Sequence, residues 1–371
     1  MTAVTTTPTA PHGDLDPRPR FPDERGGVAI LGCGSIAQSA HLPAYEQYGV
    51  GVVGVWARSP ATVARLPSRF PGIGRVYRSP EELLADPQVR IVDIATPTRG
   101  RLAWIEAAVD AGKHVLAQKP LTDDPAEVEA LVRLGERAEA AGVRVAVNQN
   151  GRWAPPWRLT TQLLRAGAVG EVVGVTHLHD KPLPPLAGTS FDDLGHMLVT
   201  DYLNHWIDVT RGWLTPARVH TVQAVDTRVP GQPASARNPW SATVTLIADS
   251  GATAVLRITG DVVTARPSCP FWVHGTRGTV RGSVLLGSDR LSLDDGSGTE
   301  EFALPGQWFV DGFAGAMAEL MTALDEDREP EHAVSDVLGT VRVMLAARDS
   351  AERGGAPVDV EDPPARRAGA P

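Results

Sequence analysis

Residues 28–37 read Val-Ala-Ile-Leu-Gly-Cys-Gly-Ser-Ile-Ala, an apolar run that ends directly in a glycine-rich turn. The turn has the spacing G-x-G-x-x-A. Gly32 permits the sharp bend, Gly34 lets a ligand approach the backbone and Ala37 lets a helix pack against the strand. A helix that starts here directs free N–H groups and a positive dipole end at phosphates. The stretch therefore predicts a strand–turn–helix unit that holds a dinucleotide pyrophosphate; the alternative is a tight turn with no ligand.

Strand and helix signals alternate on either side of this unit, over Gly27–Asn148. Ser79-Pro80-Glu81-Glu82 and Asp124-Pro125-Ala126-Glu127 each place an N-cap residue before a proline, which starts a helix. Short apolar runs indicate strands buried on both faces of a parallel sheet. They occur at Val28–Leu31, Gly51–Trp56, Val76–Tyr77, Ile91–Ala95, His114–Ala117 and Val143–Val147. We expect an α/β Rossmann domain with a doubly wound parallel sheet over residues 26–148.

The pattern changes after Asn150. Helices are expected at Trp157–Ala166, Gly195–Arg211, Asp311–Asp325 and Ser335–Glu352. Strands separated by turns are expected at Val219–Thr227, Ala242–Ala248, Thr253–Thr259, Phe271–His274 and Thr279–Leu285. Residues 149–356 are therefore predicted to form an α+β substrate-binding domain with a large, mainly antiparallel open sheet. Residues 1–25, rich in Thr, Ala and Pro, and residues 357–371 are predicted to be tails, the first of them disordered.

Composition limits the partners and the compartment. The 371 residues carry a formal net charge of −9 and no run of Lys and Arg, so no nucleic-acid partner is expected. No apolar run is long enough to span a bilayer, and the first 25 residues lack the features of an export signal. The two cysteines, Cys33 and Cys269, predict neither a metal site nor a structural disulfide. We expect a soluble protein in the reducing cytoplasm, without a membrane partner.

The end of the second predicted strand bears on the choice between NAD and NADP. An NAD enzyme usually has an acidic residue there, about 20 residues beyond the glycine turn, on the ribose 2′-hydroxyl. This chain has Ala57, followed by Arg58 and Ser59. A guanidinium and a hydroxyl would hold a 2′-phosphate, so the sequence favours NADP over NAD. The alternative for Arg58 is an ordinary solvated surface arginine.

Several short stretches carry a family resemblance. They are Ala111-Gly-Lys-His-Val-Leu-Ala-Gln-Lys-Pro120, Thr96-Pro97-Thr98, Asn148-Gln-Asn-Gly-Arg-Trp153 with Pro155, Ala166-Gly-Ala-Val-Gly-Glu-Val172 and Asp201-Tyr-Leu-Asn-His-Trp-Ile-Asp208. Together they resemble the Gfo/Idh/MocA family of oxidoreductases over nearly the whole chain. Three positions depart from the family pattern: Gln118 replaces a Glu, Arg101 a His and Asn204 a Gly.

The resemblance implies nicotinamide chemistry on sugars, nucleotide-sugars or cyclitols. It also implies a cis Lys119–Pro120 bond, and homodimers or homotetramers built on the open face of the C-terminal sheet. The motifs are specific for the family but say little about the substrate, beyond a small polyhydroxylated molecule.

The residues themselves support an acid–base role. Asp201 and His205 lie four apart, so they would share one helix face, where a carboxylate orients an imidazole and raises its pKa. Lys119 ends a strand at the edge where ligands bind in open α/β sheets. We predict that Lys119 polarises the substrate oxygen and shares the proton relay, and that His205 is the general acid–base. Asp201 orients His205 or binds a substrate hydroxyl. The alternatives are a surface lysine and a hydrogen-bonded core histidine.

The binding residues follow from the motifs. The predicted cofactor-binding set is Gly32, Cys33, Gly34, Ser35, Ile36, Ala37, Arg58, Ser59, Thr96, Pro97, Thr98, Gln118, Lys119, Asn148, Arg152 and Trp153. The predicted substrate-binding set is Lys119, Asn150, His179, Lys181, Asp201 and His205. Packing at the domain junction is an equal alternative for Trp153, a solvated loop for His179 and Lys181, and Asp208 is expected to be structural. Asp201, His205 and His196 lack a zinc pattern, so no metal is predicted.

Three functions remain open on the sequence. The first is reversible alcohol/ketone oxidoreduction on a polyhydroxylated substrate. The second is redox-neutral glycoside cleavage, in which a tightly held NAD oxidises C3 transiently. The third is a non-catalytic ligand sensor, against which the presence of Lys119, Asp201 and His205 argues. The first is the prediction.

Overall fold

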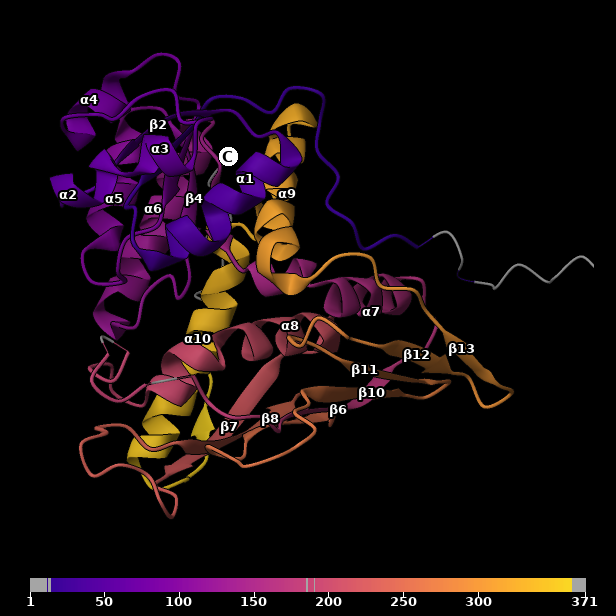
Figure 1. Cartoon of the computed structure of the whole chain (residues 1–371). Coiled ribbons are helices and arrows are strands. Elements are labelled where there is room, and N and C mark those ends of the chain that lie inside the picture. Colours follow the sequence, from indigo (N-terminus) through magenta and orange to yellow (C-terminus); the bar gives the residue numbers. More distant parts are fainter. Residues whose placement is uncertain (1–11, 13–14, 185, 190, 362–371) are drawn as a thin grey trace, which may run out of the picture.

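The computed structural model describes residues 12, 15–184, 186–189 and 191–361. Residues 1–11 and 13–14 of the predicted N-terminal tail, and residues 362–371 of the C-terminal one, lie outside this range. Two sheets form separate layers of the molecule, one in each half of the chain, with α9 (Phe313–Asp325) and α10 (Val334–Glu352) beside and between them (Figure 1). The predicted fold class is confirmed.

The first sheet has five parallel strands in the order β2-β1-β3-β4-β5. The strands are β1 (Val28–Leu31), β2 (Val52–Trp56), β3 (Ile91–Ile94), β4 (His114–Gln118) and β5 (Val145–Asn148). The helices around it are η1 (Ala37–His41), α1 (Leu42–Tyr48), α2 (Pro60–Ala64), α3 (Leu66–Arg69), α4 (Pro80–Ala85), α5 (Arg101–Asp110), η2 (Pro125–Glu127) and α6 (Val128–Ala140). The predicted strand Val76–Tyr77 is wrong, because only an isolated bridge joins Val76 to Val55.

The local helix signals act as expected. The Ser79 hydroxyl accepts a hydrogen bond from the Glu82 N–H and caps α4. The Asp124 carboxylate accepts one from the Ala126 N–H at the start of η2, which runs on into α6. Such caps satisfy N–H groups that have no partner inside the helix.

The second sheet has nine strands in the order β13-β12-β11-β10-β6-β9-β8-β7-β14, and only the β6–β9 pair is parallel. They are β6 (Val172–His179), β7 (Val219–Thr227), β8 (Ser241–Ala248), β9 (Thr253–Ile258), β10 (Pro270–Gly275), β11 (Thr279–Ser283), β12 (Leu291–Asp294), β13 (Thr299–Glu301) and β14 (Val358–Asp359). Helices α7 (Pro155–Arg165) and α8 (Asn204–Leu214) lie on one face of it (Figure 1). The 3-10 helix η3 (Asn150–Trp153) precedes α7, and the π-helices η4 (Leu198–Tyr202) and η5 (Trp308–Gly312) precede α8 and α9.

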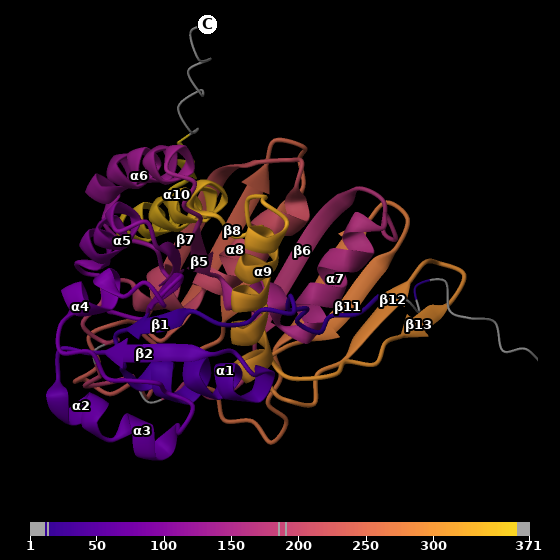
Figure 2. The same cartoon turned by 90° about the horizontal axis from the view of Figure 1, so that it is seen from above.

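Three details correct the sequence prediction. The helix expected over Gly195–Arg211 is two helices, η4 and α8. The last strand, β14, pairs with β7 inside the stretch predicted to be a tail. Part of the predicted N-terminal tail also contacts the rest of the protein. The Gln162 side chain donates to the main-chain oxygen of Asp16, and the ring centroids of Phe21 and Tyr48 are 5.6 Å apart. Figure 2 shows this segment crossing beside α9.

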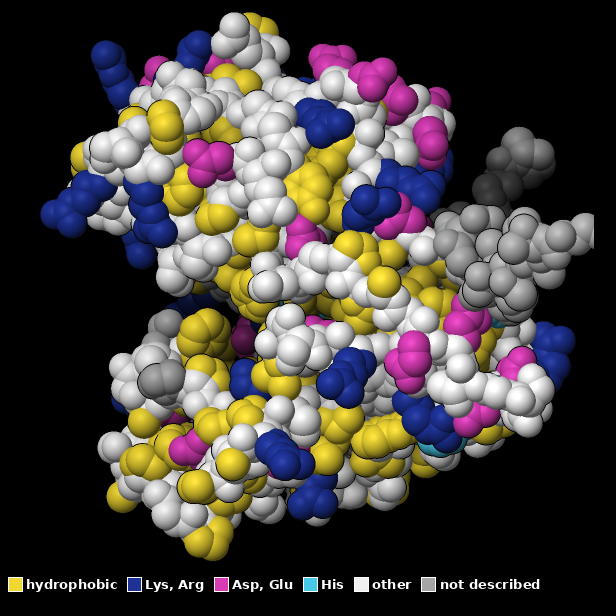
Figure 3. Space-filling model, turned by 45° about the vertical axis from the view of Figure 1, so that its right-hand side comes forward, with side chains coloured by type: hydrophobic (Ala, Val, Ile, Leu, Met, Phe, Trp, Pro, Cys, Tyr) yellow, Lys and Arg dark blue, Asp and Glu magenta, His cyan; other side chains and the backbone are white. Residues whose placement is uncertain are grey.

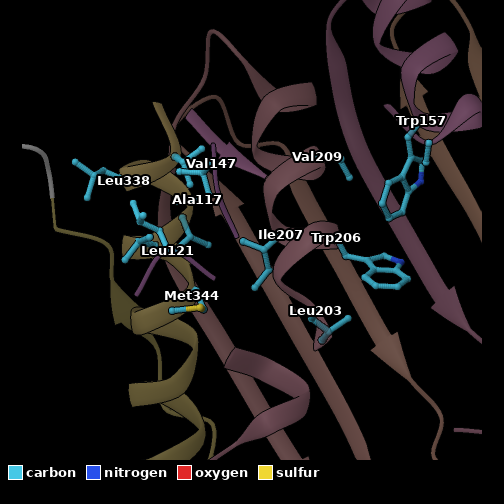
Figure 4. Packing of buried hydrophobic residues seen from close by; sticks show 14 of the residues in the cluster. Ala117, Leu121, Val147, Trp157, Leu203, Trp206, Ile207, Val209, Leu338 and Met344 are labelled. Atoms are coloured by element: carbon cyan, nitrogen blue, oxygen red, sulfur yellow. The ribbon is translucent and has the colours of Figure 1, made fainter. Parts of the chain in front are cut away.

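The C-terminal helices complete the core of the N-terminal half. Phe313, Met317 and Leu320 of α9 are buried in one apolar cluster with residues of β1 and β2. Helix α10 lies in a second cluster that extends from β4 and β5 to α8, as Leu338, Met344 and Ile207 illustrate (Figure 4). The two halves therefore share cores, and their relative position is set by apolar packing.

Candidate active site

The glycine turn after β1 fits a dinucleotide. Gly32 has φ +101°, and a Cβ atom there would lie 2.9 Å from the Ala95 carbonyl, so only glycine is accommodated without strain. Gly34 is exposed, and a Cβ atom there would meet nothing within 4 Å, which leaves room for a ligand at the backbone. Across the turn, Oγ1 of Thr96 is buried with no hydrogen-bond partner among the described residues. The exposed backbone at Gly34 and the unpaired Thr96 hydroxyl thus lie at the edge where a pyrophosphate and ribose would bind.

Other predicted cofactor residues border the same edge. Arg58 and Ser59 follow β2 and are exposed, and the Ser59 hydroxyl caps α2 by accepting from the Thr62 N–H. Pro97 is exposed and Thr98 half-buried after β3, while Ser35 and Ile36 begin the first helix. Cys33 is buried, and burial raises the pKa of its thiol to about 12, so it stays protonated and packs rather than reacts.

Lys119 reaches from the N-terminal half to the C-terminal one. Its Nζ atom donates to Oδ1 and to the main-chain oxygen of Asp201, both at 3.2 Å. The side chains are 18% and 13% exposed, so the pair is nearly closed off but not sealed from solvent. The surface is hollowed between the upper and lower halves of the molecule (Figure 3). The Lys119–Pro120 peptide bond is cis, as the family resemblance implied.

His205 lies in α8, and its side chain is 7% exposed. Burial and the nearby charge of Lys119 hold the pKa of His205 well below 6.5. The imidazole is therefore neutral near pH 7 and able to accept a proton. The Trp308 ring packs edge-on against it, with centroids 5.2 Å apart.

The predicted role of Asp201 as a partner that orients His205 and raises its pKa is wrong. The π-helix η4 ends at Tyr202 and α8 starts at Asn204, so the regular four-residue spacing is broken between the two side chains. Asp201 pairs with Lys119 instead, and the pKa of His205 is lowered rather than raised. The other predicted role of Asp201, binding a substrate hydroxyl, is compatible with this position.

Arg101 is a residue whose importance the sequence did not reveal. Its side chain is 2% exposed, and its guanidinium donates to the main-chain oxygens of Thr96 and Gln118, both at 2.6 Å, and of Pro120. It therefore ties the loop after β3 to both sides of Lys119. The signal that could have found it is its place at the start of α5, where the family has a histidine.

Trp308 was also missed. Its indole N–H donates to Oδ1 of Asn150 at 2.7 Å across 158 residues of sequence. Asn150, predicted to bind substrate, is thereby linked through Trp308 to His205, against which the Trp308 ring packs. No local sequence pattern could have paired two residues so far apart.

Arg152 and Trp153 do not fit their predicted place in the cofactor site. The Arg152 guanidinium donates to both carboxylate oxygens of Asp208, to Asp336 and to the Glu331 main-chain oxygen. Trp153 is buried, with its ring 4.8 Å from that of His332. Both residues hold the domain junction, and Asp208 is structural, as expected.

His179 and Lys181 lie at the end of β6. Nε2 of His179 is 2.7 Å from the Tyr202 hydroxyl, and the Tyr202 ring stacks on Trp206, with centroids 5.6 Å apart. Burial lowers the pKa of His179 to about 4, so this histidine is neutral. Lys181 follows two residues later and is half-buried. His179 therefore lies near Asp201, because its partner Tyr202 directly follows Asp201 in the chain.

Comparison with known proteins identifies the family. Residues 27–149 match the family described as "Oxidoreductase family, NAD-binding Rossmann fold", and residues 157–281 match the "GFO/IDH/MocA C-terminal domain". The chain belongs to the Gfo/Idh/MocA family of oxidoreductases. The resemblance read from the motifs is therefore confirmed, as is the prediction of an enzyme that uses a nicotinamide cofactor.

Individual Gfo/Idh/MocA proteins differ in their sequence identity to this chain and in how much of it they match. The D-apiose dehydrogenase of Paraburkholderia graminis is 25% identical over 343 residues, which is 88% of each protein. An uncharacterized oxidoreductase of Rhizobium meliloti, ORF334, is 35% identical over 144 residues, 38% of this chain and only 42% of that protein. An Agrobacterium radiobacter oxidoreductase, solved with NAD⁺, L-tartaric acid and magnesium, has the same fold, with a TM-score of 0.78, 24% identity and coverage of 91% and 98%.

Neither a candidate metal centre nor a membrane-spanning helix occurs among the described residues. No group of three or more His, Cys, Asp or Glu side chains there is arranged to hold a metal ion. No helix in that part is long and apolar enough to cross a membrane.

Proposed function

We propose that the protein transfers hydride between a nicotinamide cofactor and a hydroxyl or keto carbon of a small polyhydroxylated substrate, a sugar, nucleotide-sugar or cyclitol. The observation that carries this proposal is the convergence of Lys119, Asp201 and His205 at the carboxyl edge of the Rossmann sheet. Ligands bind at this edge in open α/β sheets. The name D-apiose dehydrogenase, given to a relative similar over most of its length, supports a sugar-like substrate.

The side chains divide the work of moving a proton. Oxidation of an alcohol requires a base for the hydroxyl proton, and the neutral His205 imidazole is available for it. The Lys119 ammonium places a positive charge where the alkoxide develops, and Asp201 holds that ammonium in place. In the reverse direction the same groups return the proton to the carbonyl oxygen. The nicotinamide, when bound, supplies or accepts the hydride.

The walls of the site fit a polar ring. We assign the Asn150 amide, the His179 imidazole and the Lys181 ammonium to substrate hydroxyls; for Asn150 this means exchanging its present bonds to Trp308 and to the Asn148 main-chain oxygen. Trp308 and Trp206 add aromatic faces beside them. An aromatic face with flanking hydrogen-bonding groups is the usual way to bind an amphipathic ring.

We further propose NADP as the preferred cofactor. Arg58 is exposed at the end of β2, where an acidic residue would bind the NAD ribose, and Ser59 lies beside it. The guanidinium is free to pair with a 2′-phosphate. Gly32, Cys33, Gly34, Ser35, Ile36, Ala37, Thr96, Pro97 and Thr98 stay assigned to the dinucleotide. The side chains of Gln118 and Asn148 are buried and hydrogen-bonded inside the protein, and Lys119 is assigned to the substrate.

The assembly and compartment are further proposals. Strand β9 turns Thr253, Val255 and Arg257 outward, on the face away from the helices, and Trp272 of the same sheet is only half-buried. We assign this open face to a homodimer or homotetramer contact. Cys33 and Cys269 are free thiols, consistent with the cytoplasm.

The decisive experiment titrates the protein with NADPH and NADH, followed by a panel of sugars, sugar acids, cyclitols and keto-sugars monitored by nicotinamide absorbance. We expect turnover of added cofactor with at least one of these substrates. Redox-neutral cleavage of a glycoside without cofactor turnover, or tight ligand binding with no chemistry, would replace this proposal with one of the other two functions.

A further inference from the structure

A cluster of buried polar side chains lies directly beneath the glycine turn and takes no part in the proposed chemistry. It consists of His41, Tyr45, Asp93, Gln118 and Asn148, each between 0% and 6% exposed. The five residues come from five elements: η1, α1 and the neighbouring strands β3, β4 and β5. Polar groups so deeply buried are costly unless their hydrogen bonds are well matched.

The orientation of Gln118 follows from an unambiguous donor. The Lys119 main-chain N–H donates to Oε1 of Gln118 at 2.7 Å, which fixes the oxygen end of the amide. The NH₂ end therefore points at Nε2 of His41, 3.1 Å away. Because an amide NH₂ group can only donate, Nε2 of His41 must be the acceptor.

The same logic continues across the imidazole. Nδ1 of His41 lies 2.6 Å from Oδ2 of Asp93, which also accepts from the Tyr45 hydroxyl at 2.6 Å. With Nε2 unprotonated, the ring proton is on Nδ1 and is donated to Asp93. A chain of hydrogen bonds with one direction thus runs from the Lys119 N–H through Gln118 and His41 to the Asp93 carboxylate.

Few other groups face the imidazole. Asn148 points its amide nitrogen at Nε2 of His41 at 3.4 Å, and the Phe313 ring of α9 lies edge-on at 5.0 Å. The Arg101 guanidinium binds the main-chain oxygen of Gln118, not its side chain. The Lys119 ammonium points away, to Asp201.

We propose that Gln118 and His41 are positioning residues that hold Lys119, and that Gln118 keeps His41 neutral as its Nδ1–H tautomer. The main-chain N–H of Lys119 is held by the Gln118 side chain, while Arg101 binds the carbonyls of Gln118 and Pro120 on either side of it. The backbone that carries the catalytic ammonium is therefore fixed on both sides. Because the amide at position 118 is neutral and does not titrate, its hydrogen bonds to the Lys119 N–H and to His41 need no change of charge.

A carboxylate at position 118 would change the protonation of the cluster. It would still accept from the Lys119 N–H, but its second oxygen could only accept from His41. The contact would need one added proton, and we expect it on Nε2 of His41, because the imidazolium would then lie between two carboxylates. Gln118→Glu should therefore take up one proton on His41, whereas Gln88→Glu, which adds the same group on the surface, should not.

The first test is spectroscopic. We would record the ring nitrogens of ¹⁵N-histidine-labelled protein, using His41→Asn to assign the signals, in the wild type, Gln118→Glu and Gln88→Glu. At one common pH, 7.5, we expect a neutral Nδ1–H imidazole in the wild type and in Gln88→Glu, and an imidazolium in Gln118→Glu. A charged or Nε2–H His41 in the wild type, or an unchanged neutral ring in Gln118→Glu, would overturn the proposal.

The second test separates positioning from folding, and it rests on the proposed function. Gln118→Met keeps the side-chain size but removes both hydrogen bonds. We expect kcat to fall about 10- to 100-fold, because the reacting lysine is displaced, with the affinity for NADPH and NADH within about threefold of wild type. Gln118→Glu, which restores an acceptor for the Lys119 N–H, should recover part of this loss. An unchanged kcat in Gln118→Met would refute the positioning role, whereas an inactive wild type would refute only the proposed reaction and leave the tautomer measurement standing.

Discussion

Nζ of Lys119 lies 3.2 Å from Oδ1 of Asp201, a residue 82 positions further along the chain. The two side chains come from opposite halves of the molecule, β4 of the Rossmann sheet running up to the lysine and η4 carrying the aspartate. The position of the proposed reactive cation is therefore defined by both halves together, and the proposed active site is complete only when they are docked.

Replacing Lys119 should abolish catalysis but spare cofactor binding. We expect Lys119→Met to lower kcat by about two to four orders of magnitude, because proton transfer and oxyanion stabilisation are both lost. Lys113→Met is a matched control, since that ammonium donates to the Asp86 and Val89 main-chain oxygens at the far end of the strand. Steady-state rates and NADPH affinity should be measured for both; equal rates in the two variants would contradict the assignment.

The acid limb of the pH–rate profile should have its midpoint below pH 6.5. The pKa of His205 is held well below 6.5 by burial and by Lys119, so the histidine remains an unprotonated base as the pH falls from 8 to 6.5. For the oxidation direction, kcat/KM should show no loss in that interval attributable to this group. An acid limb with a midpoint at or above 6.5 that disappears in His205→Asn would show that the imidazole titrates in the ordinary range.

The two glycines of the turn should respond differently to alanine. At Gly34 a methyl group meets no protein atom, so Gly34→Ala should fold normally but lose about tenfold or more in dinucleotide affinity. At Gly32 the positive φ and the Ala95 backbone leave no room, so Gly32→Ala should lower the melting temperature itself. Calorimetric melting and fluorescence titration distinguish these results; unchanged affinity in a folded Gly34→Ala would mean that the turn holds no ligand.

Arg58 should decide between the two nicotinamide cofactors. Arg58→Ala should weaken NADPH binding by about 10- to 100-fold, the usual value of a charged hydrogen bond to phosphate, and leave NADH nearly unchanged. Arg78→Ala, which removes another exposed arginine beyond β2, serves as the control. Equal effects on both cofactors, or none, would favour the reading of Arg58 as a solvated surface residue.

Acid should destabilise the fold through its buried histidines. Burial lowers the pKa of His177 and His332 to about 3, and that of His179 to about 4, against 6.5 in the unfolded chain. Below pH 6.5 the unfolded state binds protons that the native state does not. Each group therefore reduces the free energy of unfolding by about 1.4 kcal/mol per pH unit until its folded-state pKa is reached.

Urea unfolding at pH 7, 6 and 5 measures this slope. His332→Phe, at a fully buried ring, should make the slope shallower, whereas His274→Gln, at an exposed strand position, should leave it unchanged. A pH-independent free energy of unfolding in the wild type would show that these histidines are accessible to solvent.

Much of the architecture could be read from the sequence because the signals are local. The strand before Gly32, the cap at Ser79 and the alternation of β7 depend on residues near one another, and the structure has β7 with the predicted bounds. The short strands β12 and β13 were missed, since they comprise only four and three residues with few apolar ones.

The contacts of the site were harder to predict because they are long-range. The motifs predicted Lys119, His205 and Asp201 as site residues, on the assumption of a regular helix between the last two. The π-helix η4 breaks that spacing, and Asp201 pairs with Lys119. Trp308 approaches His205 from the far end of the chain. Such pairings depend on how the halves dock, which no local pattern contains.

The packing of α9 has a consequence for biosynthesis. Phe313 and Met317 fill the space beside β1 and β2, although almost 300 residues separate them from those strands at the start of the chain. The amino-terminal half cannot finish its interior while the ribosome is still translating the middle of the message. Until α9 emerges, the nascent chain presents an open apolar surface that would attract chaperones. A product of premature termination before α9 would be unable to bury that surface.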